Sequence, residues 1–157
     1  MDELKVTSRA FFDNEYMPKK HTGFGEDISP EFHIHNLSDK AMSIAIIMDD
    51  LDIPFNQTIN HWLIWNIPKT DIIPENIPYG PSVASLGNAI QGAAYGKNRY
   101  RGPKQPVFIR GVHRYIYRFY ALDCFLNLDY SKNKKHLIKA MQGHIIQQGS
   151  ITGKFKR

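Results

Sequence analysis

Short apolar segments alternate with turn-forming clusters along most of the chain. The best strand candidates are rich in β-branched and aromatic residues, and they read FHIHNLS, SIAIIMDDLD, HWLIWNIP and HRYIYRFYALD. Such residues favour strands, and the polar, Gly-rich and Pro-rich connections between these segments are typical of turns. The pattern therefore predicts a mainly β fold.

The period of the apolar residues changes near the C-terminus, in SKNKKHLIKAMQGHIIQQ over residues 131–148. Here they recur at spacings of three and four, which predicts one face of a helix. Ser131 or Asn133 is a suitable N-cap, Gly149 supplies a stop, and SITGKF returns to strand alternation. Gly143 falls inside this predicted helix. Glycine costs about 1 kcal/mol relative to alanine there, which indicates close packing.

A long connection precedes the last strand candidate. Glycine and proline punctuate the segment from Pro74 to Pro106, so it is predicted to be mostly loop. Loops of this length are uncommon in a compact domain and tend to be functional.

Length and composition favour one globular unit. With 157 residues, 42% of them apolar, we expect a single domain over residues 1–157 with one well-buried core. The single Cys124 excludes an internal disulfide, and the acidic start MDELKVTS lacks a signal-peptide pattern. No apolar run approaches the roughly 18 residues needed to span a bilayer. We expect a soluble, cytoplasmic protein with no transmembrane segment and no cofactor.

The net charge of +5 is concentrated in one region of the chain. No acidic residue lies between Asn76 and Leu122, whereas seven basic residues do. Such a region either serves as a solvated face or attracts an anionic partner. The seven are Lys97, Arg99, Arg101, Lys104, Arg110, Arg114 and Arg118.

Carboxylates end one strand candidate, and a histidine begins the next. Asp50 and Asp52 are expected to point the same way because strand side chains alternate faces, and His61 follows about ten residues later. If the strands are neighbours, this cluster could ligate a divalent metal, perform acid/base catalysis, or orient a histidine that binds an anion. It could also be purely structural, with the carboxylates accepting backbone N–H bonds.

The strand candidate GVHRYIYRFYALD begins with another histidine. Alternation places His113, Tyr115 and Tyr117 on one face and the arginines on the other. In the preceding loop, Gly102 and Pro103 could expose backbone N–H groups in a rigid turn near an anion, although a Gly-Pro pair more often marks only a turn.

Other chemistry is weakly signalled. The His-x-His spacing of His33 and His35 is found in metal sites, but here solvent-facing side chains are the favoured interpretation. Cys124 ends an apolar strand, where a thiol tends to be inert. The sequence contains no nucleophile elbow, Walker loop or zinc-protease helix motif.

Several ordered motifs together are more specific than any one of them. They are ISPEF, DLDIP, HWLIWNIP, QG followed by YGKNRYRGP, GVHRYIYRFYALD and AMQGHIIQQGSITGKF. In this order the chain resembles the phosphatidylethanolamine-binding protein (PEBP) family, in its bacterial Raf-kinase-inhibitor-like branch, from about Ile28 onward.

The resemblance implies a Greek-key β-sandwich with a few peripheral helices, including one near the C-terminus, and a small anion pocket at one end. The family's DPDAP motif corresponds to Asp50, Leu51, Asp52, Ile53 and Pro54, and its pocket histidine to His61. The Gly-Pro turn corresponds to Gly102 and Pro103, and the His-Arg-Tyr motif to His113, Arg114 and Tyr115. In relatives the pocket accepts phosphate, acetate or a phospholipid head group.

The sequence departs from the family pattern at several positions. Leu51 and Ile53 replace the central Pro and Ala of DPDAP, and Ala94 stands where an asparagine is common. Lys104 and Gln105 replace Cys-Pro after the Gly-Pro turn, which places a cation near the expected rim of the pocket.

We therefore expect a non-enzymatic protein that binds a phosphate-bearing or carboxylate small ligand at Asp50, Asp52, His61, Gly102, Pro103, His113 and Tyr115. We expect the two aspartates to orient histidines rather than to contact the anion. Some relatives inhibit kinases or proteases, so modulation of such an enzyme is a further expectation. The alternatives are a metal-assisted hydrolase that uses the Asp/His cluster and a basic surface for nucleic acid or anionic membrane. No specific nucleic acid is expected, and a homodimer is left open.

Overall fold

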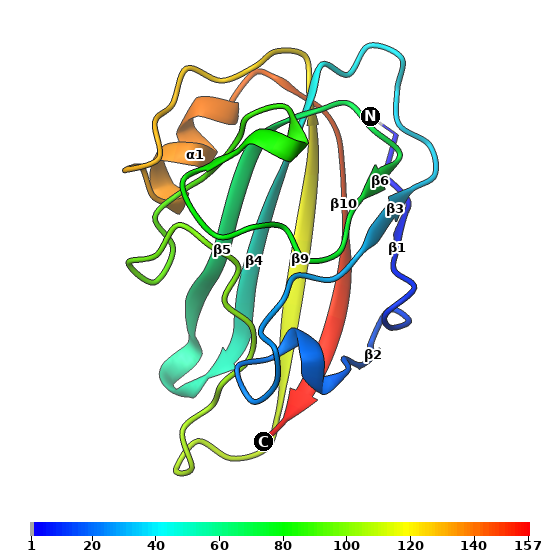
Figure 1. Cartoon of the computed structure of the whole chain (residues 1–157). Helices are drawn as coiled ribbons and strands as arrows, with labels where there is room; N and C mark the ends of the chain where they lie inside the picture. The colour runs from blue at the N-terminus through cyan, green and yellow to red at the C-terminus, as the bar shows by residue number, and fades with distance from the viewer. Residues whose placement is uncertain (1) are drawn as a thin grey trace.

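Four long strands lie side by side in the main sheet of the molecule (Figure 1). In this computed structural model, which describes residues 2–157, they are β4 (Ser43–Ile53), β5 (Gln57–Pro68), β9 (Val112–Leu122) and β10 (Ile145–Lys156). All neighbouring pairs among the four are antiparallel, in the order β10-β9-β4-β5. β4 pairs with β9 although β5 and the long connection separate them in the sequence. Residues far apart along the chain therefore meet at both ends of the sheet. Short strands extend it, namely β2 (Glu15–Tyr16), β7 (Ser82–Val83) and β8 (Ala89–Gln91).

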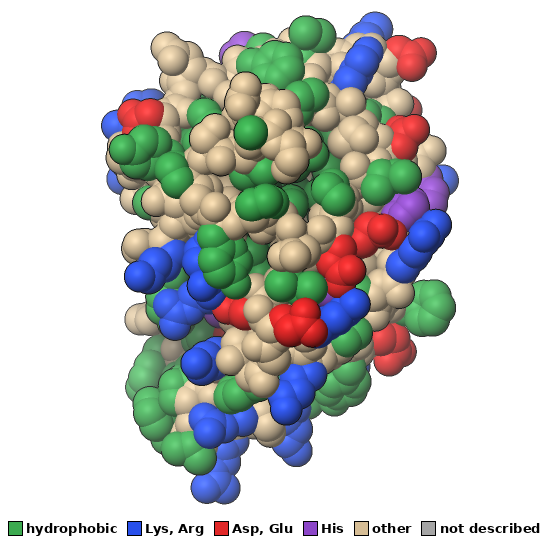
Figure 2. All heavy atoms as spheres, in the orientation of Figure 1, with side chains coloured by type: hydrophobic (Ala, Val, Ile, Leu, Met, Phe, Trp, Pro, Cys, Tyr) green, Lys and Arg blue, Asp and Glu red, His purple; other side chains and the backbone are tan. Residues whose placement is uncertain are grey.

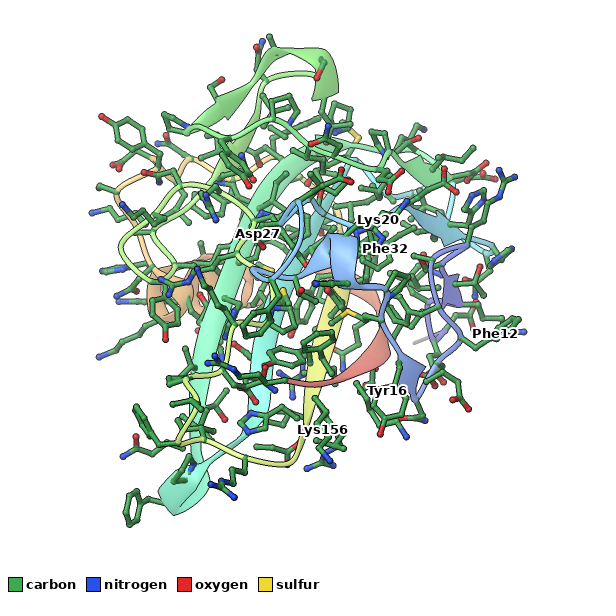
Figure 3. All side chains as sticks on the ribbon, turned by 60° about the horizontal axis from the view of Figure 1, so that its bottom comes forward. Phe12, Tyr16, Lys20, Asp27, Phe32 and Lys156 are labelled. Atoms are coloured by element: carbon green, nitrogen blue, oxygen red, sulfur yellow. The ribbon has the colours of Figure 1, made fainter. Side chains whose placement is uncertain are left out.

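A smaller sheet covers one face of the main sheet. It consists of β1 (Val6–Thr7), β3 (Phe32–Ile34) and β6 (Ile72–Ile73), in the order β1-β3-β6. The fully buried Phe32 ring lies 5.1 Å from the Tyr117 ring and 5.0 Å from the Phe119 ring of β9 (Figure 3). Inward-facing apolar side chains from both sheets thus form the main core, and the predicted β-sandwich is confirmed.

The opposite face of the main sheet carries a second apolar cluster, which includes Leu63, Trp65, Leu137 and Met141. The last two come from α1 (Lys134–Met141), so the helix predicted near the C-terminus is confirmed. Asn133 is its N-cap, and the Asn133 side chain accepts the His136 backbone N–H.

The predicted end of this helix was wrong. The helix stops at Met141, and Ile145 already begins β10. Gly143 is the reason, because its φ of +82° is a left-handed conformation that glycine adopts without strain. Nothing lies within 4 Å of where a Cβ would be, so close packing does not explain this glycine.

The long connection is mostly loop, as predicted. It contains β7, β8 and the short helix η3 (Ala84–Leu86); the other short helices are η1 (Lys19–His21) and η2 (Pro54–Asn56). Gln91 of β8 fastens the loop to the sheet: its Oε1 accepts the Trp62 indole N–H at 2.8 Å, and its Nε2 donates to the Pro78 and Gly80 carbonyls. Across residues 2–157, no helix combines the length and apolar character that a membrane crossing requires.

Candidate functional site

Asp50 near the end of β4 and His113 near the start of β9 meet at one end of the main sheet. Asp50 lies opposite Tyr115 in the register of the two strands, so its side chain reaches the neighbouring His113. His113 Nδ1 lies 2.8 Å from Asp50 Oδ2 and 3.1 Å from Oδ1, and both side chains are buried. The carboxylate is an acceptor, so Nδ1 carries the proton and Nε2 is the ring nitrogen left for a ligand.

His61 of β5 approaches the same place from the other side of β4. Its Nδ1 donates to the Arg101 carbonyl at 2.8 Å, which again leaves Nε2 without a bond to the protein among residues 2–157. Burial lowers the pKa of His61, so the imidazole is neutral at pH 7 in the free protein. Its ring packs edge-on against Tyr95 and Tyr115, with 5.4 Å between centroids in each case.

The two histidines line one small cavity of about 100 Å³, which we call the histidine pocket. That volume corresponds to roughly three water molecules in the liquid. Burial and the neighbouring Asp50 carboxylate raise the pKa of the Tyr115 phenol, so this hydroxyl stays protonated and can donate. The residues around the pocket are Asp50, Ile53, Ile59, His61, Tyr95, Arg101, Lys104, Gln105, Pro106, Ile109, His113 and Tyr115.

Asp52 is placed differently from the prediction. It does not line the histidine pocket but binds Arg114, with Nε–Oδ2 and Nη2–Oδ1 distances of 2.8 Å and the Arg114 backbone N–H at 2.7 Å. The pairing of β4 with β5 is irregular between Asp50 and Ile53, so simple alternation fails at this strand end. Asp52 therefore orients an arginine, and Asp50 alone orients a histidine.

Gly102 and Pro103 also lie outside the pocket lining. The Gly102 N–H is bonded to Asp27 Oδ1 at 2.7 Å, so it is not available to an anion. A Cβ at Gly102 would lie 2.1 Å from the His21 carbonyl oxygen, which explains the glycine. The expected backbone anion site in this turn is thus replaced by a structural role, namely anchoring the loop that carries Arg101 and Lys104.

Sequence reasoning missed two residues that shape the pocket. Asp27, in the loop between η1 and β3 (Figure 3), binds both Gly102 and Arg99, the latter at 2.6 Å. Tyr95 has a φ of +57°, and its ring stacks on the Arg101 guanidinium at 3.7 Å and packs against His61. Left-handed backbone at a tyrosine gives no sequence signal, and Asp27 lies 72 and 75 residues from its two partners along the chain.

Three of the seven basic residues in the stretch pair with acidic residues from elsewhere in the sequence. Arg99 pairs with Asp27 and Arg114 with Asp52. Arg118 and Lys134 both bind the fully buried Asp49 on the other face of β4. Tyr115 and Tyr117 are buried, so they cannot stack on nucleic-acid bases. These observations weaken the prediction of a nucleic-acid surface.

The metal-assisted alternative loses its proposed ligand set. Within the described residues, Asp50, Asp52, His61 and His113 do not converge as metal ligands, because Asp52 is turned toward Arg114. His33 binds Glu31, His35 binds Thr7, and their rings lie 6.4 Å apart.

Comparison with known proteins agrees with this architecture. The sequence profile of the phosphatidylethanolamine-binding protein family matches residues 7–156. The chain belongs to the phosphatidylethanolamine-binding protein family. Among curated relatives, a UPF0098 protein of Pyrococcus horikoshii is 44% identical over 155 residues, which are 98% of this chain and 77% of the relative. A UPF0098 protein of Pyrococcus abyssi is 40% identical, over 99% of this chain and 87% of the relative.

Solved structures show the same fold. A Chlamydia trachomatis protein described as a PEBP homologue superposes with a TM-score of 0.85 at 28% identity, covering 100% of this chain and 99% of the other. E. coli YbcL, described as a member of the mammalian PEBP family, has a TM-score of 0.86 at 21% identity, with 99% of both chains covered. In this member of the family, Lys104 and Gln105, which depart from the family pattern, both line the histidine pocket.

Proposed function

We propose that this PEBP is a non-enzymatic binding protein that holds a small anion in the histidine pocket, either phosphate, a phosphate monoester, a carboxylate or a phospholipid head group. The observation that carries the proposal is the arrangement of two buried imidazoles from different strands. Each uses Nδ1 to bond the protein and leaves Nε2 for the pocket. Two ring nitrogens fixed in this way require little ordering when a ligand binds, and each can donate to an anion once it carries a proton.

The charge around the pocket favours an anion. Asp50 lines it, but its carboxylate is engaged by His113 and by the Asp52 backbone N–H at 2.9 Å. Arg101 and Lys104 add positive charge at the same cavity. A volume of about 100 Å³ accommodates a group of a few heavy atoms and excludes larger ones.

Binding should include uptake of a proton. Burial keeps His61 neutral at pH 7, so a hydrogen bond between Nε2 and an anion needs one more proton. Either Nε2 takes up this proton from solvent as the anion binds, or the ligand carries it into the pocket. Affinity for an anion that does not titrate, such as sulfate, should therefore rise as the pH falls from 8 toward 6.

The rim of the pocket favours a lipid as the source of the head group. Phe55 at the tip of the β4–β5 hairpin is 91% exposed, and Phe108 in the loop before β9 is 77% exposed. Figure 1 shows the β4–β5 hairpin and the loop before β9 projecting at the lower end of the molecule, which carries the pocket, and Figure 2 shows hydrophobic side chains among Lys and Arg there. Large apolar side chains that insert into a bilayer interface stabilise binding by ~1.5–3 kcal/mol each when fully buried.

The pocket is tested by titration calorimetry and thermal shift with sulfate and with a phosphate monoester, against chloride at equal ionic strength. Sulfate and the monoester should raise the melting temperature, and His61→Gln should lose this shift. His35→Gln, an exposed histidine outside the pocket, is the matched control. Equal shifts for chloride and sulfate, or full retention by His61→Gln, would contradict the proposal.

The lipid source is tested separately with vesicles of phosphatidylcholine containing phosphatidylglycerol. Phe55→Ser with Phe108→Ser should reduce vesicle binding while the affinity for the soluble monoester stays unchanged. If the soluble monoester binds but vesicles do not, the pocket is retained and the lipid source is rejected.

A further inference from the structure

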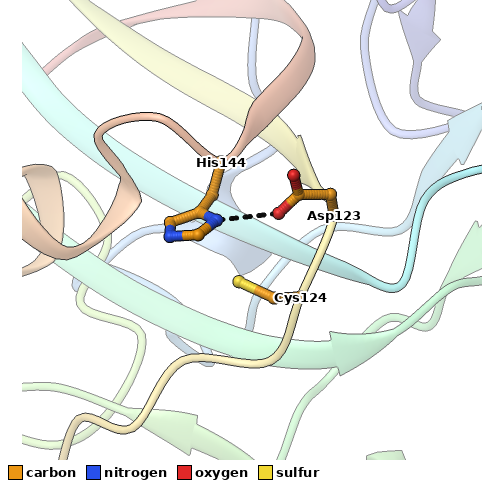
Figure 4. Close-up of side chains that lie close together, drawn as sticks. All are labelled: Asp123, Cys124 and His144. Carbon is orange, nitrogen blue, oxygen red and sulfur yellow. Dashed lines mark hydrogen bonds and ion pairs between the residues drawn. The ribbon is translucent and has the colours of Figure 1, made fainter.

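Three side chains with metal-binding atoms converge at the opposite end of β9 from the histidine pocket (Figure 4). Asp123 and Cys124 follow the last residue of β9, and His144 immediately precedes β10. One carboxylate oxygen, one thiol sulfur and one imidazole nitrogen all lie within 4.8 Å of one another. His144 Nδ1 is already 2.8 Å from Asp123 Oδ1.

The backbone holds these residues in place. The Asp123 N–H donates to the His144 carbonyl at 3.0 Å, and Leu122 pairs with Ile145 in the sheet. The Cys124 carbonyl accepts the Ser43 hydroxyl at 2.6 Å. The chain leaves the sheet after β9, forms α1 and returns to the sheet at β10. The cluster therefore lies where the two ends of the segment between β9 and β10 come together.

The combination of donors selects a particular class of metal. A thiolate and an imidazole favour zinc and similar borderline-soft divalent cations over magnesium or calcium. Zinc bonds of about 2.0–2.3 Å place tetrahedral ligands roughly 3.3–3.7 Å apart, which small side-chain rotations can reach from the present separations. Three protein ligands leave a fourth position for water.

We propose that Asp123, Cys124 and His144 form a binding site for one Zn²⁺ ion. The rival explanation is an exposed Asp–His ion pair with an uninvolved thiol. A dication among these three groups would favour the thiolate form of Cys124 and neutralise the Asp123 carboxylate. The metal would connect the two ends of the segment between β9 and β10 and leave the histidine pocket unaffected.

The test is metal binding by the intact reduced protein, with Co²⁺ as a spectroscopic substitute for Zn²⁺. One equivalent of Co²⁺ should give a thiolate-to-cobalt charge-transfer band in the near ultraviolet. Zinc should displace the cobalt and raise the melting temperature. Cys124→Ser should abolish the band, and His144→Ala should weaken zinc affinity by about tenfold or more, with both metal-free variants melting near the wild type.

His35→Gln is the matched control, because His33 and His35 are the rival His-x-His pair. It should bind zinc as the wild type does. The proposal is overturned if no charge-transfer band forms, if Cys124→Ser binds zinc as tightly as the wild type, or if His35→Gln removes the binding.

Discussion

Replacement of Asp50 by asparagine tests how the histidine pocket holds an anion, because two electrostatic effects oppose each other there. Asp50 is 3% exposed and accepts the His113 Nδ1–H at 2.8 Å. A carboxylate near the pocket repels an anion directly. It also stabilises a doubly protonated His113, which attracts one. An asparagine at this position would keep the shape of the side chain and remove both effects.

Coulomb's law gives the size of each effect, and the charge of His113 in the complex gives the sign of their sum. With an effective dielectric constant of 20, a monoanion about 4 Å from the imidazolium centre is attracted by about 4 kcal/mol. The Asp50 carboxylate, on the far side of the ring at roughly 7 Å, repels it by about 2.4 kcal/mol. If His113 is protonated in the complex, the pair supplies a net ~1.8 kcal/mol, and Asp50→Asn weakens binding roughly twentyfold. If His113 binds as a neutral ring, only the repulsion is lost and binding tightens.

We expect Asp50→Asn to bind the anion about twentyfold more weakly than the wild type. The affinity is measured by NMR titration with methanesulfonate at pH 7 and fixed ionic strength, and the imidazole signals report the protonation of His113. Asp52→Asn is the matched control, since it removes a carboxylate two residues away that binds Arg114 outside the pocket lining. It should change the affinity less than about threefold, consistent with a partly exposed ion pair. Tighter binding by Asp50→Asn would refute the role assigned to Asp50.

Three further predictions concern stability. Burial lowers the pKa of His21 and His61, so below about pH 6.5 the folded state binds fewer protons than the unfolded state. The unfolding free energy from urea titration should therefore fall as the pH drops from 6.5 to 5, by up to about 1.4 kcal/mol per pH unit for each histidine. Replacing both His21 and His61 by Gln should flatten this slope. Gln91→Leu removes three hydrogen bonds, one of them from the Trp62 indole, and should lower the unfolding free energy by about 3 kcal/mol in urea titration; a loss below about 1 kcal/mol would contradict the anchoring role. Gly102→Ala places a Cβ against a backbone carbonyl and should cost about 1–3 kcal/mol by thermal unfolding, and an unchanged melting temperature would contradict the close approach.

The long strands could be predicted from sequence because burial repeats with the period of a strand. On β9 the alternation of His113, Tyr115 and Tyr117 with arginines matches the observed burial. The pairing of Asp50 with His113 required one more fact, the adjacency of β4 and β9, which the strand pattern does not give. The family resemblance implied only that the two residues belong to one pocket.

The failed predictions share a physical cause. Asp52 follows a register shift, Gly143 adopts a left-handed φ, and the Gly102 N–H is taken by Asp27 from a distant loop. Local periodicity carries no information about bulges, about positive φ, or about which distant side chain satisfies a backbone donor.

The histidine pocket itself depends on such distant contacts. Both imidazoles owe their orientation to acceptors on other segments of the chain, the Arg101 carbonyl for His61 and Asp50 for His113. Arg101 is in turn held by the Tyr95 ring, in a loop that the Asp27–Gly102 bond anchors. Since neither ring must reorganise to receive a ligand, affinity should depend mainly on protonation and desolvation of the pocket. Substitutions in the supporting loop should then alter anion affinity through His61 without any direct contact with the anion.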